Sequence, residues 1–186
     1  MRRPRLALSG SAGTGKSTLG RALAEVLEVP YIPEGMRARL EAGLDLHQLS
    51  HEALRALVVE LWDEQRAAED EAIRQAGGLV ADRSVVDFAA FWLHYRFTED
   101  AEGTAAFFGQ VMERLPLYDR VVLLPWGALP LVADGVRTSN PWIQRHFQAT
   151  VEGLLFREVP PRQLLVLPPI ASLEARVYCV LEALGS

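Results

Sequence analysis

The chain has 186 residues, of which 49% are hydrophobic, and this length provides for one well-buried α/β domain while excluding two large ones. Its formal net charge of −5, with no basic cluster beyond the first five residues, argues against a nucleic-acid-binding groove and favours a small molecule as the partner. One cysteine rules out an intrachain disulfide, and no apolar run reaches the roughly 18 residues of a membrane span, so we expect a cytoplasmic protein with no membrane partner.

The first predicted element is an apolar strand over residues 6–9, and apolar residues at helical spacing follow up to residue 27. Between them lies the pattern G-x-x-x-x-G-K-[ST], which is typical of a phosphate-binding loop between a strand and a helix. Glycines permit backbone angles that turn successive N–H groups towards phosphate oxygens at the positive end of the helix. The residues assigned to nucleotide binding are Gly10, Ser11, Ala12, Gly13, Thr14, Gly15, Lys16, Ser17 and Thr18.

Two residues of this motif have separate expected roles. Lys16, the only lysine of the chain, reaches the β and γ phosphates, and Ser17 binds a magnesium ion. The alternative is a glycine-rich turn that happens to contain Lys-Ser, but the pattern and its position between a strand and a helix both favour the phosphate loop. We therefore expect the protein to bind a nucleoside triphosphate.

The rest of the chain alternates helices with short apolar strands, which is typical of a parallel sheet covered on both faces. Further strands are predicted over residues 29–33, 79–82, 118–124 and 163–167. Helices are predicted over residues 51–75, 85–96, 99–115 and 172–184, and a helical pattern resumes at residue 142. We treat residues 1–186 as a single domain, with a lid in the segment from about residue 125 to 161, which is rich in proline, glycine and polar residues up to that helix.

Two charged residues stand at the end of the strand that is predicted to finish at residue 82. Because ligands of open α/β sheets bind at the carboxyl ends of the strands, we expect Asp82 to hold magnesium, directly or through water. Arg83 then faces the transferred phosphate or the acceptor. The alternative makes Asp82 the N-cap of the next helix and Arg83 a surface charge, although Ser84 is itself a candidate cap.

Glu34 stands at the end of the second predicted strand. A carboxylate there faces the space beyond the γ-phosphate, where it can orient an acceptor hydroxyl and accept its proton. The alternative is a solvated loop glutamate paired with Arg37 or Arg39. The sequence leaves these two interpretations open.

The segment Asp134-Gly135-Val136-Arg137 lies inside the predicted lid. Asp-Gly is a turn signal, so one interpretation is a surface turn. We favour a mobile lid in which Arg137 moves onto the phosphates and stabilises the negative charge of the transition state.

The motifs at residues 10–18, Pro33-Glu34, Asp82-Arg83-Ser84 and 134–137 together resemble the small P-loop kinase-like ATPases that are grouped with the nicotinamide riboside kinase domain and catalogued as AAA-type ATPases. The same order is similar to deoxynucleoside kinases, although these have a glutamate at the position of Asp82. The resemblance implies a P-loop NTPase fold, a three-layer αβα sandwich with a five-stranded parallel sheet in the order 2-3-1-4-5. It also implies phosphoryl transfer with ATP and Mg²⁺. It implies Glu34 as the acceptor-side base, Asp82 as the metal partner and Arg137 as a lid residue. Together with Lys16 and Arg83, these are the candidate catalytic residues.

We expect a small-molecule kinase, because a simple nucleotide switch needs neither an acceptor-side base nor an arginine lid. Its acceptor would carry a hydroxyl on a nucleoside-like or related metabolite, and a homodimer is also considered. The alternative is an ATP-hydrolysing switch or ATPase module that acts on a protein partner. The candidates for the acceptor pocket, each of which can equally belong to the core, are Tyr31, Trp62, Gln65, Phe88, Phe91 and Tyr95. The candidates for adenine contact are Pro168, Pro169 and Ile170.

Overall fold

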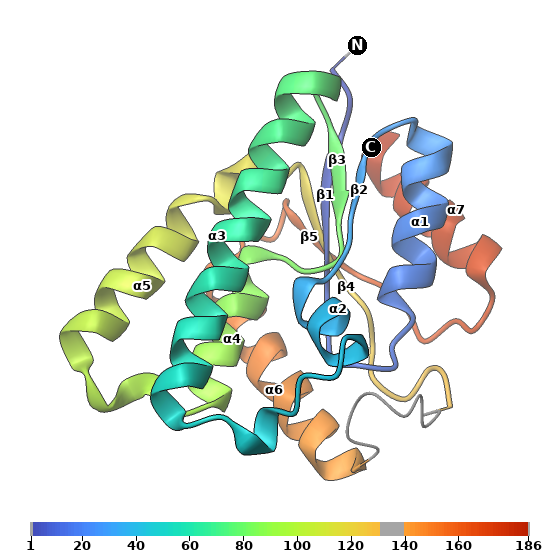
Figure 1. Ribbon diagram of the computed structural model, residues 1–186. Helices are drawn as coiled ribbons and strands as arrows, with labels where there is room; N and C mark the ends of the chain where they lie inside the picture. Colours follow the sequence, from blue (N-terminus) through green and yellow to red (C-terminus); the bar gives the residue numbers. More distant parts are fainter. Residues whose placement is uncertain (1, 131–139, 186) are drawn as a thin grey trace.

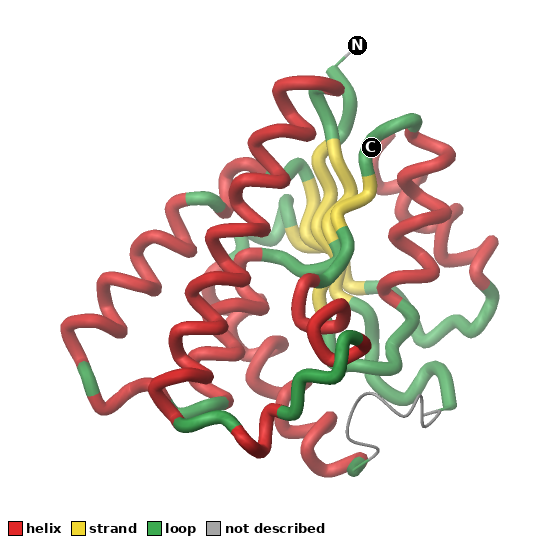
Figure 2. Tube along the Cα trace, viewed as in Figure 1, coloured by secondary structure: helices red, strands yellow, loops and turns green. Residues whose placement is uncertain are grey.

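A five-stranded parallel sheet forms the centre of the protein in a computed structural model that describes residues 2–130 and 140–185 (Figures 1 and 2). The strands are β1 (Arg5–Ser9), β2 (Tyr31–Ile32), β3 (Leu79–Ala81), β4 (Arg120–Leu123) and β5 (Leu164–Val166). Their order across the sheet is β2-β3-β1-β4-β5, and every neighbouring pair is parallel. The predicted strand order is therefore confirmed.

In the described ranges, seven α-helices surround the sheet and complete the predicted three layers. They are α1 (Lys16–Leu27), α2 (Gly35–Glu41), α3 (His51–Ala76), α4 (Val85–His94), α5 (Ala101–Glu113), α6 (Pro141–Glu158) and α7 (Leu173–Gly185). Short 3₁₀ helices cover Leu46–Gln48, Phe97–Glu99 and Leu115–Leu117. Helices α1 and α7 lie on one side of the sheet, and α3, α4, α5 and α6 lie on the other (Figure 1).

The alternation of side chains along β1 connects the two layers of helices to two hydrophobic cores. Leu6 and Leu8 belong to the core beneath α1 and α7, whereas Ala7 belongs to the larger core on the other face. Successive residues of a strand point to opposite faces, so a strand that is buried on both sides reads as a continuous apolar run. Among the described residues, no helix is long and apolar enough to cross a membrane.

Helix α2 was not predicted from the sequence, where this segment follows the strand as a loop. It is seven residues long and packs on α3. The contact requires a glycine at its start, because a Cβ on Gly35 would lie 2.8 Å from the Leu61 side chain. The helix starts directly after Glu34 and so turns the chain at the carboxyl end of β2.

Helix α6 occupies the second half of the predicted lid interval. Its residues Phe147, Val151 and Leu155 are buried in the same core as α4. Because this helix is packed in the core, the part of the interval that can still act as a lid lies before residue 140. Asp134 and Arg137 lie outside the described residues, so their roles stay predictions.

Candidate active site

The phosphate-loop motif joins β1 to α1, as its pattern predicts. Gly15 is the N-cap of α1 with a φ of 87°, and a Cβ there would lie 2.8 Å from an Arg176 nitrogen. Gly10 has a φ of 135°, and a Cβ there would lie 2.9 Å from the Leu124 carbonyl oxygen. Both positions therefore require glycine, and the loop leads directly into the positive end of a helix.

The Lys16 side chain is buried and lies against the first half of the loop. Its Nζ donates hydrogen bonds to the carbonyl oxygens of Gly10 at 2.8 Å and Ser11 at 2.7 Å. Burial, and next the positive charge of Arg83, lower the pKa of Lys16 to about 7, although nearby carboxylates oppose the shift. Additional negative charge near Nζ would favour the ammonium form, and the phosphates of a nucleotide carry such charge.

Asp82 follows β3 directly and is only 1% exposed. Its Oδ2 accepts hydrogen bonds from the Ser17 hydroxyl at 2.5 Å and from the Tyr31 hydroxyl at 2.8 Å. The N-cap interpretation of Asp82 is wrong, because Ser84 caps α4 in a capping box with Asp87. Burial, and next the Asp82 carboxylate, raise the pKa of Tyr31, so its hydroxyl stays protonated and available as a donor.

The donors around Asp82 fit a magnesium ion. Its Oδ1 is buried without a hydrogen-bond partner among the described residues, and Ser17 adds a hydroxyl oxygen. Mg²⁺ takes oxygen ligands and is usually held by one or two carboxylates together with substrate phosphates and water. In the described part of the chain, no cluster of three or more His, Cys, Asp or Glu could hold a metal. Asp82 and Ser17 offer two protein oxygens, and phosphates and water would have to supply the remaining ligands of a bound Mg²⁺.

Arg83 connects three parts of the site and is 3% exposed. Its Nε and Nη2 donate to Glu34 Oε1 at 3.1 and 2.9 Å. Its Nη1 donates to Asp87 Oδ1 at 2.8 Å and to the Gly10 carbonyl at 2.7 Å. Arg83 is therefore not a surface charge, and it joins the end of β2 to α4 and to the phosphate loop.

Glu34 is 7% exposed and lies inside the site rather than in solvent. The alternative partners are engaged elsewhere, since Arg37 pairs with Glu41, and Arg39 pairs with surface glutamates of α3. The solvated-loop interpretation of Glu34 is therefore wrong. Its contact with Arg83 gives this carboxylate a fixed orientation beside the phosphate loop.

The surroundings of Arg83 keep it charged. Burial by itself lowers its pKa, but the carboxylates of Glu34 and Asp87 outweigh this effect, so the pKa lies above its usual value. The guanidinium carbon also lies 5.1 Å from the ring centre of Phe91 on α4 and 5.5 Å from that of Phe147 on α6. These ring faces stabilise a cation that is shielded from water.

Asp87 is a site residue that the sequence reasoning missed. It is fully buried, and it accepts hydrogen bonds from Arg83, from the Ser84 backbone N–H and from the hydroxyl of Ser9 at the end of β1. The spacing Ser-x-x-Asp at the start of a helix is a capping-box signal that could have identified it. Asp87 fixes Arg83 relative to the strand that leads into the phosphate loop.

Three further residues contact the loop backbone from distant parts of the chain. Arg176 on α7 donates to the Thr14 carbonyl at 2.9 Å and to the Ile170 carbonyl at 2.5 Å. Gln144 and Gln148 on α6 accept hydrogen bonds from loop N–H groups. No local pattern in the sequence identifies these three residues, because their partners in the loop lie more than a hundred positions away.

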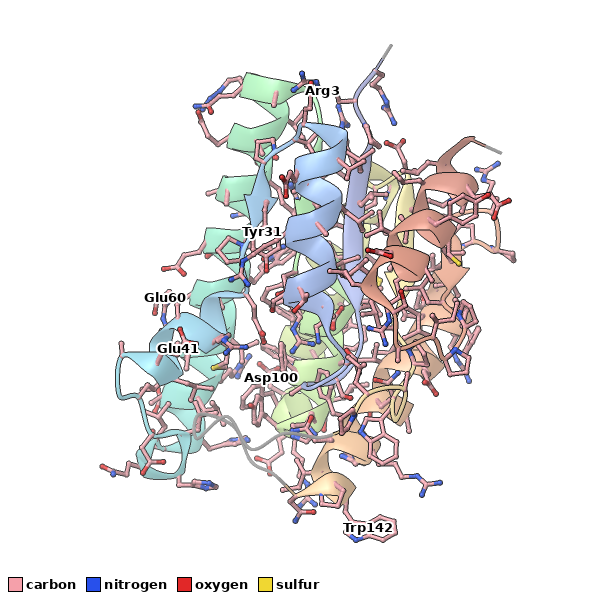
Figure 3. All side chains as sticks on the ribbon, turned by 90° about the vertical axis from the view of Figure 1, so that its right-hand side faces the viewer. Arg3, Tyr31, Glu41, Glu60, Asp100 and Trp142 are labelled. Carbon is pink, nitrogen blue, oxygen red and sulfur yellow. The ribbon has the colours of Figure 1, made fainter. Side chains whose placement is uncertain are left out.

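Most of the candidates for the acceptor pocket belong to the core. Trp62, Phe88 and Phe91 are buried in the larger core. The Gln65 amide donates to Glu69 Oε1 at 2.9 Å and to the Arg83 carbonyl at 3.2 Å. Gln65 therefore holds the backbone of Arg83. Tyr31 lies beside α1, where its hydroxyl contacts Asp82 (Figure 3).

The fold and this geometry define a protein of the P-loop class. A family described as an AAA domain matches residues 5–176, and the chain belongs to this family. No curated protein matches the sequence. The match to the AAA-domain family confirms the family resemblance that the motifs indicate.

Solved structures show the same fold at low sequence identity. The NadR protein in complex with NR has a TM-score of 0.73 and 18% identity, covering 100% of this chain and 52% of that chain. The chain thus spans about half the length of this NadR chain. A thymidylate kinase from Ehrlichia chaffeensis has a TM-score of 0.67 and 13% identity over 100% of both chains. A deoxyadenosine kinase from M. mycoides has a TM-score of 0.60 and 12% identity over 97% and 98% of the two chains.

Proposed function

We propose that this chain is an ATP- and Mg²⁺-dependent kinase that transfers the γ-phosphoryl group of ATP to a hydroxyl of a nucleoside-like metabolite. The observation that carries the proposal is the buried Glu34–Arg83 pair beside the phosphate loop, with separations of 2.9 and 3.1 Å. A buried carboxylate in this position suits the activation of an acceptor hydroxyl. The deoxyadenosine kinase with the same fold supports a nucleoside as the class of acceptor.

On the nucleotide side, the N–H groups of the loop and Lys16 bind the phosphate oxygens. Their positive charge lowers the energy of the negative charge that develops in phosphoryl transfer. Ser17 and Asp82 hold Mg²⁺, which supplies further charge neutralisation when it is bound. Tyr31 keeps the Asp82 carboxylate oriented through its hydrogen bond.

On the acceptor side, Glu34 orients the hydroxyl and accepts its proton while the oxygen attacks the γ phosphorus and ADP leaves. Arg83 fixes the carboxylate through two hydrogen bonds to one oxygen. Arg83 also donates to the Gly10 carbonyl, so it fixes the position of the Glu34 carboxylate relative to the phosphate loop. The proposed role of Arg137, stabilisation of charge on the phosphoryl group, rests on the sequence motif.

The test is a phosphoryl-transfer screen with γ-labelled ATP and Mg²⁺. Ribo- and deoxyribonucleosides, nicotinamide riboside and unrelated small alcohols are each compared with a water-only reaction. Transfer of label to a nucleoside hydroxyl is expected. Turnover that no small molecule stimulates, but that a protein partner does, would contradict the proposal and select an ATPase switch.

A pair of glutamate variants makes the screen specific for the site. Glu34→Gln removes the base and should reduce transfer by about a hundredfold, with ATP affinity nearly unchanged. Glu64→Gln is the matched control, because Glu64 lies on the surface of α3, where it pairs with Arg39 of α2. Equal transfer rates in the two variants would exclude Glu34 as the acceptor-side base.

A further inference from the structure

Two buried glutamines of α6 bind the backbone of the phosphate loop. Gln148 Oε1 accepts a hydrogen bond from the Ser11 N–H at 2.7 Å, and Gln144 Oε1 accepts one from the Ala12 N–H at 3.1 Å. The glutamines are 3% and 6% exposed, respectively. Both amide oxygens therefore satisfy donors in the first half of the loop.

The amide of Gln148 has a defined orientation. Its Nε2 donates to the Leu124 carbonyl at 3.1 Å and to Glu152 Oε1 at 2.8 Å, which directs Oε1 towards Ser11. Leu124 immediately follows β4, the strand next to β1. The glutamine thus holds the loop against the neighbouring strand of the sheet.

One face of α6 contacts both the phosphate loop and Arg83. Residues three and four apart share a face of a helix, so Gln144, Phe147 and Gln148 point in the same direction. The Phe147 ring lies beneath the Arg83 guanidinium at 5.5 Å. The same helical face therefore supports the phosphate loop and the arginine that orients Glu34.

The glutamines of α6 hold Ser11 and Ala12, and Arg176 of α7 holds the Thr14 carbonyl. Ser11 and Ala12 are buried, whereas Gly13 and Thr18 are exposed. A loop that is already fixed before its ligand arrives binds more tightly, because the free energy of ordering is not taken from binding. The glutamine contacts fix Ser11 and Ala12 and leave Gly13 exposed.

We propose that Gln144 and Gln148 are positioning residues that hold the phosphate loop in its phosphate-binding conformation. The inference rests on the proposed use of the loop for ATP, but it does not depend on transfer to an acceptor. Removing either amide oxygen should leave a loop N–H without its acceptor and allow the loop to leave this conformation.

The experiment compares Gln144→Met and Gln148→Met, which keep the side-chain length but lose the amide, with Thr150→Ala. Thr150 is on the same helix, and its hydroxyl donates to the His146 carbonyl of the helix backbone. Isothermal titration measures the affinity for Mg·ATP and for inorganic tripolyphosphate, and thermal unfolding measures stability without ligand. Each glutamine variant should bind both ligands about tenfold more weakly, and the control should bind like the wild type.

The outcomes separate positioning from a merely structural role. Glutamine variants that melt at a lower temperature but bind both ligands with wild-type affinity in the folded state would overturn the proposal, as would tighter binding. If Gln148→Met does not fold, Gln144→Met decides. A wild type that binds ATP but transfers to no acceptor would refute the kinase proposal alone. A wild type that binds neither ligand would overturn both.

Discussion

The protonation of Lys16 should make ATP binding depend strongly on pH. In the protein without nucleotide, burial and the charge of Arg83 lower the pKa of Lys16 from 10.5 to about 7. Bound phosphates supply negative charge beside Nζ, which favours the ammonium form and raises the pKa again. Above pH 7, ATP binding should therefore be accompanied by proton uptake at Lys16.

The size of the effect follows from these values. At pH 8, a group with a pKa of about 7 is protonated in roughly a tenth of the molecules. If ATP restores the ordinary pKa, binding at pH 8 takes up about 0.9 proton, and the Kd rises roughly tenfold between pH 8 and pH 9. Because the folded pKa lies below the unfolded value, unfolding also takes up a proton between about pH 7 and pH 10.5. The contribution of Lys16 to stability thus rises with pH in this window.

The assay is isothermal titration of ATP with saturating Mg²⁺ at pH 8, in buffers of different ionisation enthalpy. The slope of the observed enthalpy gives the number of protons taken up. Lys16→Met is the control, because it removes the titrating group, and its proton uptake should be close to zero with much weaker binding. A wild-type Kd that is equal at pH 8 and pH 9, with no proton uptake, would contradict the lowered pKa of Lys16.

Three other substitutions test individual contacts. Asp82→Asn should preserve the melting temperature but weaken Mg²⁺-dependent activity, because an amide lacks the charge that balances the cation; a large loss of stability with normal turnover would contradict this. Arg83→Lys should lower the free energy of unfolding by about 3 kcal/mol and the melting temperature by roughly 6–12 °C, because lysine cannot make the same set of bonds; an unchanged melting curve would disprove it. Gly20→Ala places a Cβ 2.7 Å from the Tyr31 ring, so calorimetry should show a melting temperature a few degrees lower despite the better helix propensity of alanine.

Local patterns were sufficient for the phosphate loop and for the alternation of helices and strands. The strand, loop and helix around residues 10–18 are contiguous, so glycine spacing and flanking apolar periodicity describe the whole unit. The parallel sheet followed from alternating elements, and its strand order followed from the family resemblance. Helix α2 escaped prediction because it is only seven residues long and packs through Gly35 on α3.

The sequence also placed Glu34, Asp82 and Arg83 at strand ends, since the carboxyl ends of parallel strands meet at one edge of the sheet. It left open whether Glu34 is solvated or buried, and it did not suggest Asp87 or the glutamines of α6.

These points depend on contacts between distant parts of the chain. The pairing of Glu34 with Arg83 joins residues 49 positions apart, and the contact of Ser11 with Gln148 joins residues 137 positions apart. A hydrogen bond depends on distance and direction in space, and local sequence patterns specify neither for residues so far apart in the chain. The sequence thus determines the chemistry of each side chain. Which residue becomes its hydrogen-bond partner depends on how the helices pack against the sheet.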